Sequence, residues 1–220
     1  MTETKDLTEI TIRLVPEMPP EITAIDEAGL ASSWYTRLED LVQVFRAQHK
    51  PMLRFLPDHL IATDLESCSV WWRPAARASL SLRTNSETVF VNVPLPGLLL
   101  ASQQSRALSV VAVKSDERPG KDTPLFHAPL PNVNERGAVC LGSTELVAFD
   151  PLSEETPWNA FWGSAFTGHQ VAGKSRRFPE DVRLLLLGLN NEPAFSLDDL
   201  EPAGVALHEW LGRFNRTGGW

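Results

Sequence analysis

The chain has 220 residues, 43% hydrophobic content and a formal net charge of −8 at pH 7, which fit a compact domain with appendages. The acidic charge argues against nucleic acid as the main ligand. Two cysteines, with no CxxC pair and no closely spaced histidines, argue against a disulfide framework and a metal site. No apolar run reaches the roughly 20 residues of a membrane span, and the first residues lack the apolar core of a secretory signal, so we expect a cytoplasmic protein without a cofactor.

Residues 1–60 are expected to form an N-terminal extension with one strand and one helix. Residues 8–14 alternate apolar and polar side chains, which is the period of a half-buried strand. Between residues 33 and 49 the apolar side chains recur at steps of three and four. This spacing predicts an amphipathic helix that ends before Pro51.

The middle of the chain is predicted to be an antiparallel meander. Residues 67–73 predict one strand, and residues 78–83 and 89–93 alternate on either side of a polar turn, which is typical of a hairpin. Residues 107–113 are dense in valine and predict a further strand, whereas 98–101 fit either a short strand or a helical turn.

Helices are predicted toward the C-terminus. Residues 158–167 have apolar side chains at helical spacing after Pro157, and residues 179–188 begin with proline and acids and end with glycine. Ser196 is predicted to cap a last helix. Residues 61–220 are therefore expected to form an α+β domain, in one compact unit with the N-terminal extension.

One segment, residues 123–142, combines an unusual set of residues around Cys140. Pro131-Asn132 precedes the cysteine, with eight residues from asparagine to cysteine, and Gly137 lies between them. The prolines forbid a regular helix here. The glycine predicts a turn that leads into a short extended piece carrying the thiol.

The order of these residues resembles the active-site segment of ubiquitin-conjugating (E2) enzymes. That segment reads His-Pro-Asn-Ile/Val, then a glycine, then an apolar residue, Cys and Leu. Leu130 departs from it, because it stands where the eukaryotic enzymes have histidine. The wider string is more similar to a bacterial branch, prokaryotic E2 family D, also called PRTRC system protein B, whose cassettes also encode ParB-related and ThiF-related proteins. The residues that carry this resemblance are Arg118-Pro119, Thr123, Pro129, Pro131-Asn132-Val133, Gly137, Val139-Cys140 and Gly142.

A second segment, residues 157–169, is similar to the family's Trp-x-x-Phe…Ser-x-Phe-Thr-His string. Gly168 is an insertion relative to that string and directly precedes His169. The resemblance as a whole covers roughly residues 71–169.

The resemblance implies an E2 (UBC)-like fold, in which an antiparallel β-meander is flanked by an N-terminal helix and C-terminal helices. It also implies that Cys140 carries a ubiquitin-like β-grasp modifier as a thioester, between a ThiF/E1-like activating protein and an acceptor. Asn132 would either donate to the tetrahedral oxyanion or hold the loop, and the sequence does not choose between these roles. His127, Arg136 and His169 are candidates for raising the thiolate fraction of Cys140.

Cys68 is expected to have the commonest role of a lone cysteine, that of a small buried apolar residue.

Two alternatives to a carrier enzyme come from other functional classes. An E2-fold binding module, docking a modifier or a plasmid-maintenance partner, would leave Cys140 idle. Leu130 in place of histidine keeps this alternative open, whereas the presence of Cys140 and Asn132 argues against it. A papain-like hydrolase would place its cysteine at a helix start, with histidine and asparagine downstream, and the residues around Cys140 do not match that pattern.

Overall fold

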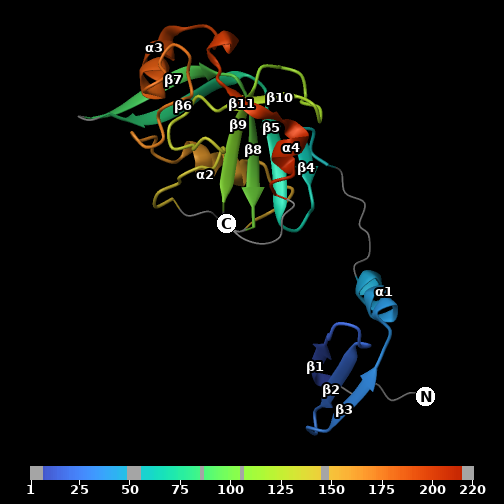
Figure 1. Cartoon of the computed structure of the whole chain (residues 1–220). Coiled ribbons are helices and arrows are strands. Elements are labelled where there is room, and N and C mark those ends of the chain that lie inside the picture. The colour runs from blue at the N-terminus through green and yellow to red at the C-terminus, as the bar shows by residue number, and fades with distance from the viewer. Residues whose placement is uncertain (1–6, 49–55, 85–86, 105–106, 145–148, 215–220) are drawn as a thin grey trace. The chain divides into compact units, whose positions relative to one another are not determined.

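The structure is a computed structural model that describes residues 7–48, 56–84, 87–104, 107–144 and 149–214. The chain forms two compact units, an N-terminal unit, Met1–Phe55, and a C-terminal unit, Leu56–Trp220 (Figure 1). None of the described helices has the length and apolar character that crossing a membrane requires.

The N-terminal unit is a three-stranded antiparallel sheet followed by one helix. Its elements are β1 (Leu7–Arg13), β2 (Glu21–Asp26), β3 (Ala31–Tyr35) and α1 (Leu38–Gln48), with the strands in the order β1-β2-β3. The predicted first strand is confirmed, but the predicted helix is wrong at its start, because residues 33–35 belong to β3. Trp34 pairs there with Ile22 of β2, and this pairing, together with the strand preference of aromatic residues, outweighs the helical spacing. His49 and Pro51, predicted at the end of the helix, lie outside the described residues.

The core of the C-terminal unit is a six-stranded sheet in the order β11-β10-β9-β8-β5-β4, in which every neighbouring pair is antiparallel. Its strands are β4 (Leu60–Thr63), β5 (Cys68–Arg73), β8 (Gly97–Gln103), β9 (Leu108–Val113), β10 (Pro124–His127) and β11 (Pro202–Ala206). The mixed α+β class and the antiparallel strands are confirmed, and residues 98–101 are strand. The proportion of strand is higher than predicted, because β2, β4, β10 and β11 had no clear sequence signal.

Both faces of this sheet are buried. Successive residues of a strand point to opposite faces, so Trp71 lies in one apolar cluster while its neighbours Val70 and Trp72 lie in a second one. Helices α2 (Glu155–Trp162) and α3 (Val182–Gly188) contribute to the first cluster, and α4 (Leu207–Leu211) contributes to the second. Because both faces are covered at the inner strands β5, β8 and β9, these three strands are buried along most of their length rather than at alternate residues.

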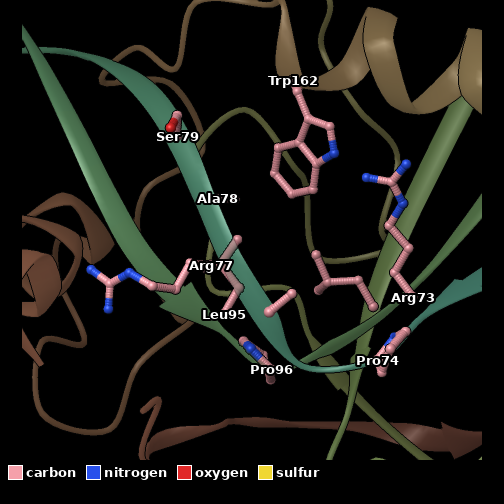
Figure 2. Close-up of a pocket in the computed structure, with 10 residues that line it drawn as sticks. Arg73, Pro74, Arg77, Ala78, Ser79, Leu95, Pro96 and Trp162 are labelled. Carbon is pink, nitrogen blue, oxygen red and sulfur yellow. The ribbon is translucent and has the colours of Figure 1, made fainter. Parts of the chain in front are cut away.

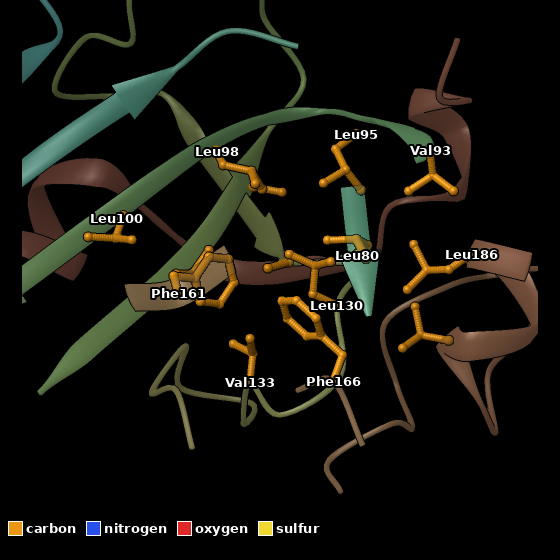
Figure 3. Packing of buried hydrophobic residues seen from close by; sticks show 14 of the residues in the cluster. Leu80, Val93, Leu95, Leu98, Leu100, Leu130, Val133, Phe161, Phe166 and Leu186 are labelled. Carbon is orange, nitrogen blue, oxygen red and sulfur yellow. The ribbon is translucent and has the colours of Figure 1, made fainter. Parts of the chain in front are cut away.

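The predicted hairpin is confirmed as a separate two-stranded sheet, β6 (Ala76–Arg83) and β7 (Thr88–Leu95). The N–H of Thr84 donates to the carbonyl oxygen of Glu87 across the turn, and residues 85–86 lie outside the described part. Leu80 and Val93 point from the hairpin into the first cluster (Figure 3). The hairpin therefore shares its core with the six-stranded sheet.

The helices after the cysteine are shorter than predicted. α2 covers Glu155–Trp162 instead of residues 158–167, because the chain after Gly163 turns away to pair with β6. The N–H of Phe166 donates to the carbonyl oxygen of Ser81, and the carbonyl oxygen of Phe166 accepts from the N–H of Arg83. α3 begins later than residue 179, at Val182, where the Asp181 side chain caps it.

The predicted helix from Ser196 is wrong over most of its length. A short 3-10 helix, η2 (Leu197–Asp199), is followed by β11, and α4 is confined to Leu207–Leu211; a second 3-10 helix, η1 (Leu189–Asn191), follows α3. β11 begins with Pro202 and contains Gly204 at φ +71°, a conformation that a helix cannot contain. Pairing with β10 therefore decides the structure of this segment.

Candidate functional site

Cys140 lies exposed at the end of a short extended piece, as a free thiol. On one side of this piece, the N–H of Val139 donates to the carbonyl oxygen of Leu108 at the start of β9 (2.9 Å). On the other side, the N–H of Cys140 donates to the carbonyl oxygen of Asn132 (2.7 Å). The backbone is thus fixed on both sides, while the side chain remains open to solvent.

The turn before this piece depends on an asparagine and a glycine. The Asn134 side-chain oxygen accepts hydrogen bonds from the N–H groups of Arg136 and Ala138, each at 2.9 Å. Gly137 has φ +89°, and a Cβ there would lie 3.0 Å from the carbonyl oxygen of Val110. Only glycine satisfies both the positive φ and the close approach, so the glycine of the motif folds residues 138–140 back toward 132–134.

Asn132 is buried, and its side chain binds the segment that follows α2. Its Nδ2 donates to the carbonyl oxygen of Ala165 (2.7 Å), and its Oδ1 accepts from the hydroxyl (2.8 Å) and the N–H (3.2 Å) of Thr167. Its backbone N–H donates to the carbonyl oxygen of His169 (2.8 Å). Asn132 has φ +59°, which asparagine tolerates better than most residues. The motif asparagine therefore connects the backbone of Cys140 to residues 165–169.

Lys174 is a buried lysine whose side chain binds the backbone of the same loop. It is 4% exposed, and its Nζ donates to the carbonyl oxygens of Leu130 (2.9 Å) and Val133, which flank Asn132 on either side. In the described part of the chain, no carboxylate lies within ion-pair distance of it. Burial therefore lowers the pKa of Lys174 to about 7.

Leu130, at the position that resembles the histidine of the eukaryotic E2 motif, is fully buried in the first cluster (Figure 3). An imidazole at this depth would need a polar partner to offset its desolvation. The side chain at this position serves packing in this protein.

His127 lies on β10, in a half-buried position. Its backbone N–H donates to the carbonyl oxygen of Glu201 (2.9 Å), and the residue pairs with Val111 of β9. Burial, and then the positive charge of Lys174, lower the pKa of His127 below its usual value. The lowered pKa favours the neutral imidazole of His127 over the imidazolium.

His169 is exposed and joins the site through its backbone, whose carbonyl oxygen binds Asn132. The preceding Gly168 packs against the Arg183 guanidinium: a Cβ there would lie 3.0 Å from its Nη1. Arg183 pairs with Asp181 (2.7 Å) and donates to the carbonyl oxygen of Arg83 (3.0 Å). The inserted glycine thus has a local role, because it leaves room for a guanidinium that connects α3 to β6.

The structure links only some of the predicted residues. Consecutive backbone hydrogen bonds run from Cys140 to Asn132 and from Asn132 to His169, whereas the described bonds of His127 run to β9 and to Glu201. Arg136 lies exposed in the turn. Thr167 is the threonine of the Phe-Thr-His string, but the sequence prediction gave it no role, because its partner Asn132 is distant in the sequence. The sequence prediction missed Lys174, and no local pattern could have revealed it, because its partners are also distant.

The other thiol belongs to a different environment. Cys68 lies buried in β5, where burial and then the negative charge of Asp64 raise the pKa of its thiol to about 11. Over the described residues, no cluster of His, Cys, Asp and Glu is arranged to hold a metal ion. Of the two cysteines, the position of Cys140 is the one suited to nucleophilic chemistry, because the reactive species is an accessible thiolate.

The comparisons with known proteins identify a family. Residues 37–203 match the family model described as Prokaryotic E2 family D. This range includes Cys140 and the residues described above that bind its loop. Comparison with curated proteins and with solved structures gave no match.

Proposed function

The chain belongs to prokaryotic E2 family D, and from this membership we propose that it is an E2-like conjugating enzyme with the UBC layout. It carries a ubiquitin-like β-grasp modifier as a thioester on Cys140. The modifier arrives from a ThiF/E1-like activating protein and leaves to an acceptor amine or thiol. The observation that supports this proposal most directly is the exposure of Cys140 on a backbone that is hydrogen-bonded to Asn132 within the family region.

The chemistry needs one sulfur that two partners can reach in turn. In loading, the Cys140 thiolate attacks the carbonyl carbon of the modifier–E1 thioester. A new carbon–sulfur bond forms, and the E1 thiolate leaves. In discharge, an acceptor amine attacks the same carbon, the Cys140 thiolate leaves, and the amine proton passes to solvent. An exposed thiol on a fixed backbone suits both steps.

Asn132 is assigned the loop-holding role within this proposal. Its side-chain oxygen already accepts two hydrogen bonds from Thr167, and its side-chain Nδ2 donates to the carbonyl oxygen of Ala165. These bonds direct the amide toward residues 165–167. Asn132 therefore acts on the thiol through backbone position rather than through the oxyanion.

The test is a loading assay with the purified full-length chain, its cognate activating protein, its modifier and ATP. Wild type is expected to form an adduct that survives non-reducing gels and disappears with added thiol. Cys140→Ser should give either a thiol-resistant oxyester or no adduct, because a hydroxyl forms an ester. Cys68→Ser is the matched control and should load normally.

Two outcomes would contradict the proposal. Normal thiol-labile loading of Cys140→Ser would show that the thioester forms elsewhere. Failure of wild type to load, when the activating protein forms its own adduct, would favour the E2-fold binding module with an idle cysteine. Direct binding of the modifier by both wild type and Cys140→Ser would then establish that alternative.

A further inference from the structure

The outer edge of β6, the edge that faces away from β7, is hydrogen-bonded to the rest of the chain over only part of its length. β6 pairs with β7 residue for residue, from Ala76 opposite Leu95 to Arg83 opposite Thr88. On the other side of β6, the carbonyl oxygen of Ser81 and the N–H of Arg83 bind Phe166. The outer edge is thus paired at residues 81 and 83.

The same edge is open two and four residues earlier. In an antiparallel strand, alternate residues direct both their N–H and their C=O to the same side. The backbone groups of Arg77 and Ser79 therefore point outward, like those of Ser81 and Arg83. Within the described residues, the backbone groups of Arg77 and Ser79 have no hydrogen-bonding partner on this side. Unpaired N–H and C=O groups in a row form a template for another extended chain.

A cavity of about 280 Å³ lies directly beside this open edge. Arg77, Ala78 and Ser79 form one wall, and Trp162 and Arg73 lie on the opposite side (Figure 2). The rest of the lining is apolar and consists of Pro74, Ala76, Leu95, Pro96 and Leu98. The cavity can therefore take one apolar side chain of a peptide that pairs with the edge.

The charged residues that line the cavity are all positive. Its lining contains two arginines and no acid, although the chain as a whole carries a net charge of −8. The Arg77 side chain extends away from the cavity and is occupied by Asn92 and by the carbonyl oxygens of Asn190 and Glu192 (Figure 2). Arg73 is different: its guanidinium lies 4.8 Å from the ring centre of Trp158, and within the described residues it has no carboxylate partner. A carboxylate entering here would find an unpaired guanidinium.

We propose that the β6 edge at Arg77 and Ser79 binds an extended acidic peptide by strand addition. Main-chain hydrogen bonds to Arg77 and Ser79 give the affinity. An apolar side chain fills the cavity, and a carboxylate two residues along, on the same side of the extended peptide, binds Arg73. Pairing to the main chain with side-chain pockets at alternate positions is a general mode of peptide recognition. The site does not depend on thioester chemistry, so it can be tested without the activating protein or the modifier.

The test uses a set of blocked hexapeptides, acetyl-Thr-X-Thr-Z-Thr-Val-amide, with X as Leu, Phe or Ser and Z as Glu, Gln or Lys, together with the set in which X and Z are exchanged. X and Z are two residues apart, so both side chains lie on the same side of the extended peptide. Binding to the full-length ¹⁵N-labelled chain is followed by NMR. We expect the apolar–Glu peptides to bind best and to shift the amide signals of Arg77 and Ser79. Replacing Glu by Gln in the peptide should weaken binding about tenfold or more, because a charge-assisted hydrogen bond is lost. N-methylation of the peptide amides that face β6 should abolish binding.

Two variants assign the contacts. Ser79→Pro removes the outward N–H, and proline is tolerated at an edge position whose N–H faces solvent; it should lose binding, whereas Ser79→Ala, which keeps the N–H, should retain it. Arg73→Met should weaken binding of the Glu peptides about tenfold and leave the Gln peptides unchanged. The proposal is overturned if no peptide binds saturably up to about 1 mM, if folded Ser79→Pro binds as wild type does, or if the N-methylated peptides bind as well as their parents. If Ser79→Pro does not fold, the N-methylated peptides alone decide.

Discussion

The side-chain oxygen of Asn132 accepts two hydrogen bonds from one residue, Thr167, through its hydroxyl at 2.8 Å and its N–H at 3.2 Å. Because the carbonyl oxygen of Asn132 also accepts from the N–H of Cys140, this pair connects the segment after α2 to the cysteine loop. Buried polar groups that lose their partners cost about 1–3 kcal/mol each. The position of the cysteine backbone therefore depends on a contact between two segments that are distant in the sequence.

Removing the Asn132 amide should affect stability more than the rate of discharge. Asn132→Ala should lower the free energy of unfolding by about 2–3 kcal/mol, because Thr167 and Ala165 lose their partners and alanine is strained at φ +59°. Asn132→Gly should be about 1 kcal/mol less destabilised, since it relieves only the strain. Urea denaturation measures both differences, and a double-mutant cycle with Thr167→Val should give a coupling of about 0.5–3 kcal/mol. A normal fold with a discharge rate lowered a hundredfold would instead assign Asn132 to the oxyanion.

Gly137 and Gly142 offer a matched pair of substitutions around the cysteine. Both have positive φ, +89° and +61°, but a Cβ at Gly137 would meet the carbonyl oxygen of Val110 at 3.0 Å, whereas a Cβ at Gly142 would meet nothing within 4 Å. Gly142→Ala should therefore cost only the backbone strain, about 1–2 kcal/mol. Gly137→Ala should cost more, about 2–4 kcal/mol, because the backbone must also shift. Equal losses in thermal or urea unfolding would contradict the close approach of residue 137 to β9.

The buried Lys174 predicts a pH dependence of stability with a definite sign. Its pKa is about 7 in the folded chain and about 10.5 when exposed, so between these values the unfolded chain binds more protons. The contribution of Lys174 to stability should therefore rise as the pH increases from about 7 to about 10, with a slope of up to about 1.4 kcal/mol per pH unit. The measurement is the free energy of unfolding against pH for wild type and Lys174→Met. The variant should be less stable, since two carbonyl oxygens lose their donor, and should lack this slope; identical slopes would show that Lys174 does not titrate in this range.

The two thiols should differ in reactivity under native conditions. Cys140 is exposed, whereas Cys68 is buried and its pKa is raised to about 11, so Cys68 is almost entirely protonated at pH 8. A colorimetric disulfide reagent at pH 8 should modify one thiol rapidly and the second only on unfolding. Cys140→Ser should lose the fast phase and Cys68→Ser should keep it. Two fast phases in the native wild type would contradict the burial of Cys68.

Local sequence was sufficient where the structure depends on neighbours in the chain. The positions of the first strand, of β5, of the β6–β7 hairpin and of β9 follow from apolar runs and alternation. In β5 and β9 these runs are buried, whereas Ile10 of the first strand is 58% exposed. The turn that precedes Cys140 was also predicted from the sequence. Gly137 supplies a positive φ within a few residues of the thiol, and that requirement is local. The order of residues around the cysteine was likewise enough to identify the family, which the match over residues 37–203 shows.

Only the tertiary structure decided the features that depend on distant partners. Residues 202–206 fall within the helix predicted from Ser196, yet they form β11, because the edge of β10 offers backbone partners there. Residues 164–167 leave the predicted helix in the same way, to bind β6 and the amide of Asn132. Lys174 gives no signal in the sequence at all, since its role arises from two carbonyl oxygens more than forty residues away. Leaving buried polar groups without hydrogen bonds costs more free energy than giving up a residue's local preference for helix or strand. The chain therefore adopts the conformation in which distant segments satisfy these groups, and a single sequence does not show where those segments meet.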